Sequence, residues 1–293
     1  MKLLNYCADG ATRLGVNTDV GVVDGAAVCA AAGLPVLATT DALIAAEAKS
    51  PGTLDAFRRA VPAAGAGLLD GTKLVFAPCV SAPEKIVCVG FNYRRHAAET
   101  NTPIPEHPVL FGKFNNALAG HGATVVLPVK YASWFDYEAE LVIVVGREMR
   151  DVAEKDALAH VFGYCTGNDL SARELQRRTS QFLLGKNPDG FAPIGPYLVT
   201  ADEAGDPDAL DIACWVNGEQ RQNSNTSDMI FKCAETLSYA SRYMTLKPGD
   251  LLFMGTPEGV IWGHPEGKRV WLKPGDRVTT EIQRLGRQEI VLA

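Results

Sequence analysis

Three acidic residues between positions 136 and 176 have the types and spacing that suit a divalent cation. Glu138 and Glu140 lie two residues apart in YEAELVIVVG, and Asp169 follows in GNDLSARELQ. Because side chains alternate along a strand, both glutamates would lie on one face, with Cα atoms about 6.5–7 Å apart. Two buried carboxylates would repel each other and lose hydration. A hard cation with oxygen ligands, such as Mg²⁺, Mn²⁺ or Ca²⁺, would offset both penalties.

This metal-site hypothesis places a strict demand on the tertiary structure. The carboxylates of Glu138, Glu140 and Asp169 must converge on one point. The hypothesis would be wrong if they lay apart, or if a lysine or arginine filled the space between them, since that cation would replace the metal.

A polar segment follows Asp169 and predicts the start of a helix. Ser171 with Glu174 three residues later has the spacing of a capping box. Arg173 and Gln176, at i+4 and i+7 from Asp169, would share its face of the helix and surround one cavity with it. The alternative is an ordinary ion pair between Asp169 and Arg173 at a helix start, which contributes little on a surface. That alternative is favoured for the pair alone, but not beside Glu138 and Glu140.

His96 and Glu99 lie three residues apart in RRHAAET, on a short helical turn. A carboxylate that orients an imidazole makes a general base that works near neutral pH. The alternatives are an exposed helix that happens to carry both residues, or two further metal ligands. The segment PIPEHP follows, where prolines forbid a continued helix, and we interpret it as part of a lid that orders on binding.

Two more residues are candidates for contacts with an anionic substrate. Lys186 lies in GKNPDGFAPIGP, whose glycines and prolines predict an irregular loop. Its ammonium could neutralise a carboxylate or an enolate, or it could be a solvated loop lysine. Thr256 ends an apolar strand at a Gly-Thr-Pro turn, where its hydroxyl and backbone N–H could bind a carboxylate. Most such turns are merely turns.

Composition limits the classes of function. The 293 residues are 47% hydrophobic and 21% charged, with a net charge of −6. This is ordinary for a globular protein, and no basic run supports nucleic-acid binding. The longest apolar runs are too short for a bilayer, and MKLLNYCADG lacks the apolar core of a signal peptide. The seven cysteines form no CxxC pair, so we expect reduced, structural thiols and a cytoplasmic protein.

The chain is predicted to contain two domains. Residues 1–80 read as a small α+β accessory domain, with short strands in MKLLNYC, RLGVN and DVGVVDG and helices around ALIAAEAKS and TLDAFRRAV. Residues 81–293 are richer in strands, punctuated by glycine and proline. The chain therefore predicts a mixed α/β, mainly β fold.

Several elements of the larger domain can be placed from local patterns. KIVCVG and YEAELVIVVG predict buried strands, and Asn217-Gly218 predicts a hairpin turn. EKDALAHVFG predicts a helix that ends at Gly163, and MIFKCAETLSYASRYM predicts another. Two KPGD turns, at residues 247–250 and 273–276, should each lead into a strand.

These segments together resemble the fumarylacetoacetate hydrolase family over residues 85 to about 290. Six motifs occur in the order and at the spacing typical of that family: KIVCVGFNYRRHAAE, VLFGKFNNALAGHG, DYEAELVIVVG, GNDLSARELQ, GKNPDGFAPIGP and GTPEGV. The resemblance implies a β-sandwich roll fold, a homodimer and a Mg²⁺ or Mn²⁺ centre. The N-terminal segment is similar to that of longer bacterial members.

The resemblance also implies roles for individual residues. Glu138, Glu140 and Asp169 fall on the metal ligands of the family, and Arg173, Gln176, Lys186 and Thr256 fall on positions that contact substrate. His96 and Glu99 match a His-Glu pair carried on a lid in members that cleave acylpyruvates or decarboxylate oxaloacetate.

The leading prediction is a metal-dependent hydrolase that cleaves a carbon–carbon bond in a 2,4-dioxo acid. In it His96, oriented by Glu99, would activate water, and Lys186 would help to neutralise the enolate that leaves. Decarboxylation of oxaloacetate would produce a similar enolate in the same site. One alternative is a lyase, hydratase or isomerase of 2-oxo acids. Another is a non-catalytic protein that binds a metabolite or a partner.

Overall fold

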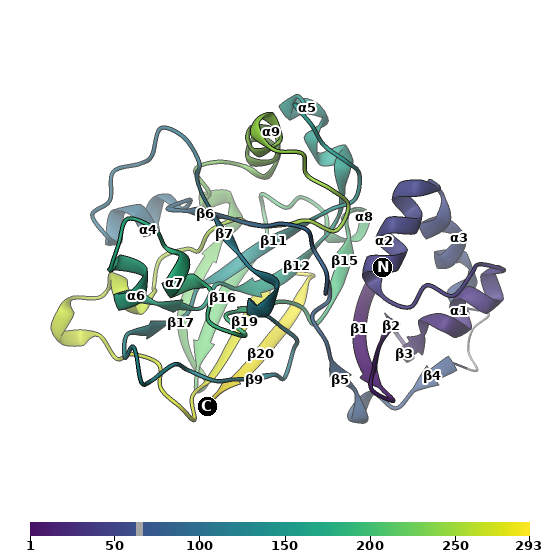
Figure 1. Cartoon of the computed structure of the whole chain (residues 1–293), viewed down its shortest axis with the longest axis horizontal. Coiled ribbons are helices and arrows are strands. Elements are labelled where there is room, and N and C mark those ends of the chain that lie inside the picture. The colour runs from purple at the N-terminus through teal and green to yellow at the C-terminus, as the bar shows by residue number, and fades with distance from the viewer. Residues whose placement is uncertain (63–66) are drawn as a thin grey trace.

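One large β-sheet runs through most of the protein, as the computed structural model in Figure 1 shows. The structure describes residues 1–62 and 67–293. Within them, ten strands follow one path and β5 (Val75–Phe76) pairs with β1 beside it. The order along the path is β4 (Leu68–Leu69), β3 (Gly21–Asp24), β2 (Ala11–Thr18), β1 (Lys2–Ala8), β15 (Leu198–Thr200), β12 (Val161–Asn168), β11 (Ala139–Val145), β18 (Leu251–Phe253), β6 (Ile86–Gly90) and β7 (Val109–Lys113).

A second sheet packs against part of the first. Its order is β17 (Glu219–Asn225), β16 (Asp211–Val216), β19 (Arg277–Ile282), β20 (Gly286–Leu292) and β9 (Thr124–Val125). Leu141 and Tyr164 of the large sheet share one apolar core with Ile212, Val278 and Ile290 of the second. Two sheets that enclose a core form a sandwich. The prediction of a mixed, mainly β fold is therefore confirmed.

Two pairs of very short strands lie outside these sheets. They are β10 (Phe135–Asp136) with β13 (Ser171–Ala172), and β8 (Leu118–Ala119) with β14 (Ala192–Pro193). The first pair joins the chain just before Glu138 to the chain just after Asp169. It therefore helps to bring the acidic residues together.

Strand β11 is buried along its whole length and divides its side chains between two cores. Leu141, Ile143 and Val145 enter the core of the sandwich, whereas Val142 and Val144 enter a core on the other face of the sheet. Neighbours β12 and β18 flank it on both edges, which explains why its sequence is a continuous apolar run. Glu138 and Glu140 extend the row of Val142 and Val144 by alternation.

The helices are short. They are α1 (Gly25–Ala32), α2 (Thr40–Lys49), α3 (Thr53–Ala60), α4 (Arg94–Glu99), α5 (Glu154–Ala157), α6 (Arg173–Arg177), α7 (Leu183–Lys186), α8 (Ala201–Ala204) and α9 (Cys233–Tyr243). Within residues 1–62 and 67–293, no helix combines the length and apolar character needed to cross a bilayer.

The predicted helix 154–163 is wrong in its second half. Helix α5 ends at Ala157, a single 3₁₀ turn follows, and Gly163 lies inside β12. A side chain at Gly163 would come within 2.1 Å of the Val199 carbonyl oxygen on β15. The glycine therefore permits close strand pairing and does not end a helix, a distinction that local periodicity cannot make.

The N-terminal segment has the predicted strands and helices, and α1 in addition. Strand β1 pairs with β15, so the large sheet continues from this segment into the rest of the chain. Leu3, Val28 and Phe57 share a core with Val142 and Phe253. The division at residues 80 and 81 stays a prediction. Figure 1 shows these purple elements at one end of the molecule.

The predicted turns are present. Asn217 and Gly218 both have positive φ, 52° and 86°, and join β16 to β17, as a two-residue hairpin requires. The KPGD turns precede β18 and β19. All seven cysteines are free.

Candidate metal centre and active site

The three predicted acidic residues converge. One carboxylate oxygen each from Glu138, Glu140 and Asp169 can be chosen so that all lie within 4.8 Å of one another, and all three residues are buried. Strands β11 and β12 are antiparallel neighbours, with Ala139 opposite Asn168. Asp169, just after β12, donates its backbone N–H to the Glu138 carbonyl at 2.9 Å. Pairing of the two strands thus places residues that are about 30 positions apart at the same end of the sheet.

Two buried lysines lie against this cluster. Lys186 Nζ is 2.6 Å from Glu138 Oε2 and 2.7 Å from Asp169 Oδ2. Lys113 Nζ is 2.5 Å from Asp169 Oδ1. Lys186 therefore fills the space between Glu138 and Asp169, contrary to the expectation, and an ion held by all three acids would displace its ammonium from these two carboxylates. Lys113 and Lys186 give these two buried carboxylates the charged partners that burial requires. The same lysines reduce the attraction of the cluster for a divalent ion.

Glu140 is the exception, since no cationic side chain of the described residues bonds to it. Its one hydrogen bond comes from the Gly255 backbone N–H, which donates to Oε2 at 2.8 Å. Burial, followed by the charges of Asp169 and Glu138, holds its pKa well above the usual range. For Glu138, burial acts in the same direction, but Lys186 and Arg173 outweigh it and lower the pKa to about 2.

The charged groups around the cluster leave an excess of one negative charge. Four buried carboxylates, those of Asp136, Glu138, Glu140 and Asp169, meet three cationic groups, those of Lys113, Arg173 and Lys186. The uncompensated member is Glu140, which faces two other acids. Three convergent carboxylates with one unneutralised charge fit a hard divalent cation, so the donor set is suited to one.

Arg173 lies differently from its prediction. It does not pair with Asp169. Its Nε donates to Asp136 Oδ2 at 2.9 Å, and its Nη1 is 2.7 Å from Glu138 Oε1 and donates to Gln176 Oε1 at 3.0 Å. The i+4 argument assumed a helix that begins before Arg173. In the structure α6 begins at Arg173 itself, after the strand pair β10–β13.

The predicted capping box is also wrong. Ser171 Oγ donates to the Asp169 carbonyl, and the helix has no side-chain cap. The Glu174 carboxylate instead accepts from the backbone N–H groups of Ser133 and Trp134. Glu174 therefore ties α6 to the segment before β10, a long-range contact that the S-x-x-E pattern could not indicate.

His96 and Glu99 form the predicted pair. His96 Nδ1 lies 2.8 Å from Glu99 Oε1, and both residues belong to α4. Since a carboxylate only accepts hydrogen bonds, the proton between them sits on Nδ1, and Nε2 is left as the basic nitrogen. His96 is 7% exposed, which excludes the alternative of a solvated helix face.

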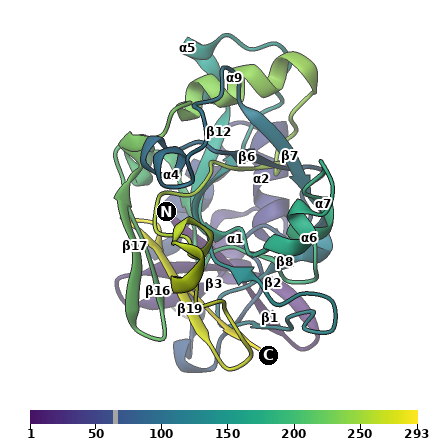
Figure 2. The ribbon, with the colours of Figure 1, turned by 90° about the vertical axis from the view of Figure 1, so that its left-hand side faces the viewer.

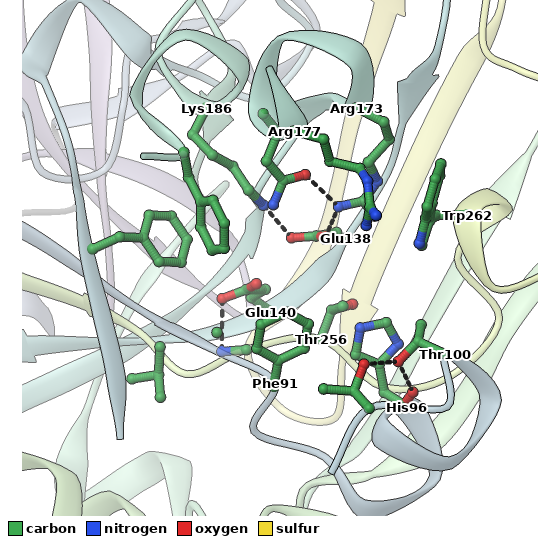
Figure 3. A pocket seen from close by; sticks show the side chains of 17 residues that line it. Phe91, His96, Thr100, Glu138, Glu140, Arg173, Arg177, Lys186, Thr256 and Trp262 are labelled. Carbon is green, nitrogen blue, oxygen red and sulfur yellow. Dashed lines mark hydrogen bonds and ion pairs between the residues drawn. The ribbon is translucent and has the colours of Figure 1, made fainter. Parts of the chain in front are cut away.

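A cavity of about 140 Å³ adjoins the acidic cluster. Figure 2 shows α4 on one side of this face of the molecule and α6 and α7 on the other. The lining of the cavity includes seven predicted site residues: His96, Glu138, Glu140, Arg173, Gln176, Lys186 and Thr256. Figure 3 shows Lys186, Arg173 and Glu138 along one wall and Thr256 and His96 along the opposite wall. The other two predicted residues, Asp169 and Glu99, lie behind the lining and bond to Lys186 and His96.

Lys186 and Thr256 are held in ways that sequence alone did not indicate. Lys186 is the last residue of α7, not part of an irregular loop, and is 2% exposed. Its ammonium lies 5.3 Å from the centroid of the Phe111 ring. Thr256 Oγ1 accepts a hydrogen bond from Gln222 Nε2 at 2.9 Å, which orients its hydroxyl.

Sequence reasoning missed several residues of the site. Lys113 and Asp136 complete the ion pairs. Three phenylalanines (Phe91, Phe111 and Phe182), Arg177 and Trp262 are also part of the lining. Lys113 and Asp136 do fall inside the motifs VLFGKFNNALAGHG and DYEAELVIVVG. Their role as partners of the acidic cluster has no local signal, because each partner is distant in sequence.

Comparison with known proteins finds relatives over most of the chain. The family model "Fumarylacetoacetate (FAA) hydrolase C-terminal" matches residues 85–292. The bovine (Bos taurus) protein named oxaloacetate tautomerase FAHD2A, mitochondrial, is 43% identical over 237 residues, which cover 80% of this chain and 74% of that protein. Its name refers to mitochondria, so the expected cytoplasmic location stays a prediction.

Solved structures agree over the full length. Fumarylacetoacetate hydrolase from Exiguobacterium antarcticum has a TM-score of 0.80 at 31% identity, covering 100% of this chain and 99% of that one. Maleylpyruvate hydrolase from Sphingobium sp. SYK-6, in complex with manganese(II) and pyruvate, has a TM-score of 0.80 at 30% identity with the same coverage. The N-terminal segment is therefore part of an arrangement shared with these chains.

Proposed function

Since the chain belongs to the fumarylacetoacetate hydrolase family, we propose that it is a divalent-metal-dependent enzyme that interconverts the keto and enol forms of a small 2-oxo acid. Oxaloacetate is the leading substrate. Support comes from the relative named oxaloacetate tautomerase, at 43% identity. This reaction belongs to the isomerase alternative given above, and we favour it over hydrolysis because of this relative.

One observation carries the proposal. Glu140, a buried carboxylate that no cationic side chain of the described residues contacts, lies in the same small cavity as an imidazole whose Nδ1 is bonded to Glu99. The first feature suits an electrophilic cation, and the second suits proton transfer. Keto–enol exchange requires both, because a proton leaves carbon 3 while negative charge develops on the oxygen of carbon 2.

Glu138, Glu140 and Asp169 would hold the ion, with Mg²⁺ and Mn²⁺ equally suited to three carboxylates. When bound, such an ion supplies a Lewis acid that stabilises charge on the substrate oxygens. The protein groups then have defined tasks. His96 Nε2 would accept the proton from carbon 3, and Glu99 would stabilise the imidazolium that forms. Transfer of this proton from the His96 imidazolium to the oxygen of carbon 2 would complete the exchange and restore the neutral imidazole.

The remaining lining residues would orient the substrate. Lys186 and Arg173 place positive charge on one wall of the cavity, where an anionic acid would lie. Gln176 and Thr256 offer an amide and a hydroxyl for its oxygens. Phe91, Phe111 and Phe182 form an apolar wall, which excludes water and strengthens each electrostatic contact.

The test follows the enol absorbance of oxaloacetate with purified protein, in Mg²⁺, in Mn²⁺ and after chelation. We expect the approach to keto–enol equilibrium to accelerate with either metal and to slow after chelation. Equal rates with and without chelator, on thoroughly stripped protein, would exclude the metal role. No acceleration in any condition would exclude the tautomerase assignment.

Hydrolytic cleavage of an acylpyruvate is the second candidate, and the solved maleylpyruvate hydrolase favours it at 30% identity. The same His96–Glu99 pair could deprotonate water, and decarboxylation of oxaloacetate would use the same cavity. Product analysis by NMR with acetylpyruvate and oxaloacetate separates these reactions. A thermal shift with oxalate and no turnover of either acid would point to the non-catalytic alternative.

Two further predictions accompany this proposal. The family resemblance predicts a homodimer, which analytical ultracentrifugation would measure.

Residues 1–80 are predicted to act as an accessory domain. Because β1 pairs with β15 and their cores are shared, we expect removal of the segment to unfold the sheet.

A further inference from the structure

Arg177 differs from the other cationic residues of the cavity. Arg173 and Lys186 are both buried and bonded to carboxylates. Arg177 lies at the end of α6, is exposed, and lines the same cavity. Among the described residues, no acidic side chain pairs with its guanidinium. The cavity therefore has one cation whose charge the protein itself does not neutralise.

An aromatic ring holds this guanidinium in place. Arg177 Cζ lies 4.4 Å from the centroid of the Trp262 ring, and Arg269 Cζ lies 4.2 Å from the same centroid. The Trp262 backbone N–H donates to the buried Asp136 carboxylate at 3.0 Å. A guanidinium stacked on a fixed ring keeps its N–H groups in its own plane, free for a bidentate contact with a carboxylate.

The cavity has two chemically distinct regions. In the view of Figure 3, Lys186 and Trp262 lie on opposite sides, with Glu138 between them. The acidic cluster and Lys186 would take the 2-oxo acid group of a ligand. Arg177 on Trp262 offers a second anion contact on the other side. A ligand with a single carboxylate would leave that contact unused.

We propose that Arg177, positioned by Trp262, is a specificity residue that binds the second carboxylate of a 2-oxo dicarboxylic acid. This inference rests on the proposed function and names the residue that would select a short dicarboxylate, such as oxaloacetate, in preference to a monocarboxylate of the same length. Arg177 takes no part in proton transfer. It contributes affinity and discrimination through a charged, planar hydrogen-bonded contact.

The experiment measures binding by calorimetry to the Mn²⁺-loaded full chain, with three stable ligands. Oxalate is short and would contact only the acidic cluster. Malate carries a second carboxylate, and 2-hydroxybutyrate has a methyl group in its place. The variants are Arg177→Gln and, as a matched control, the neighbouring Arg178→Gln. Arg178 is also exposed but does not line the cavity.

We expect Arg177→Gln to weaken the binding of malate at least tenfold, while the affinities for oxalate and 2-hydroxybutyrate change less than twofold. Arg178→Gln should leave all three unchanged. Arg177→Lys, which keeps the charge and loses the planar stack, should recover part of the malate affinity. An unchanged malate affinity, or an equal loss of affinity for all three ligands, would overturn this inference and leave the proposed function standing. Oxalate that binds wild-type protein no better with Mn²⁺ than without it would overturn the proposed function as well.

Discussion

Glu99 joins His96 to the loop of residues 255–263. Its Oε1 lies 2.8 Å from His96 Nδ1, and its Oε2 accepts from the Gly259 backbone N–H at 3.0 Å. A Cβ at Gly263 would come within 2.5 Å of the Glu99 carboxyl carbon. The histidine is thus oriented by a carboxylate that is itself fixed by two glycines of the segment 255–263.

We predict that His96→Ala lowers turnover by about 10²–10⁴-fold, the usual contribution of a general base, without weakening Mn²⁺ binding. Glu99→Gln should lower turnover less, because the imidazole stays in place but loses its anionic partner. Steady-state kinetics and Mn²⁺ titration measure the two effects. Glu154→Gln, at an exposed residue of α5 that does not line the cavity, is the control. Loss of the ion in His96→Ala would mean that His96 is a ligand.

Glu140→Gln should change stability in opposite directions with and without metal. The substitution removes a buried carboxylate that, within residues 1–62 and 67–293, has no cationic contact, and it keeps an acceptor for the Gly255 N–H. In chelator, we expect the free energy of unfolding to rise by about 1–3 kcal/mol. In Mn²⁺, the variant should lose the stabilisation that the wild type gains.

Urea unfolding in EDTA and in Mn²⁺ measures both effects of Glu140→Gln. Glu266→Gln, at an exposed glutamate, is the control and should follow the wild type. A variant less stable than wild type in EDTA would show that the Glu140 charge is already compensated.

Asp136→Asn should destabilise the protein by about 3 kcal/mol, because it leaves the buried Arg173 short of a counterion. Asp136 also accepts from the backbone N–H groups of Ile261 and Trp262, at 2.9 and 3.0 Å. The substitution should therefore raise KM more than it lowers kcat, through a displaced Arg173 and loop. Chemical unfolding and kinetics test this, with Asp19→Asn at an exposed turn as control. A change under 0.5 kcal/mol would contradict the assignment.

The buried imidazole of His121 leads us to expect a loss of stability in mild acid. Burial lowers the pKa of its imidazole from the usual 6.5, and its Nδ1 accepts from the Glu289 backbone N–H at 3.1 Å. The unfolded chain then binds a proton more readily than the folded one, so stability falls as pH drops below about 6.5. His121→Asn keeps an acceptor and should reduce this slope, measured by unfolding between pH 7 and pH 5. His107→Asn, at an exposed histidine, should retain the slope.

Local patterns predicted those features that depend on neighbouring residues. The apolar run of β11, the hairpin at Asn217 and Gly218, and the helix of MIFKCAETLSYASRYM are all present. Spacing of three residues was enough for the His96–Glu99 pair, because one turn of α4 holds both. Where distant contacts compete, the same reasoning failed: Glu174 caps no helix, and Gly163 belongs to a strand.

The amino-acid order alone identified the acidic trio, the His-Glu pair and the family, since each depends on residue types at short spacing or on motifs in sequence. The partners of those acids could not be found in this way. Lys113, Asp136 and Lys186 reach the cluster because strands β7, β10 and β11 and helix α7 come together in space. Cationic side chains from three separate elements, β7, α6 and α7, neutralise Glu138 and Asp169 and leave Glu140 without such a contact among the described residues. Charge compensation of that kind depends on distances that no local pattern contains.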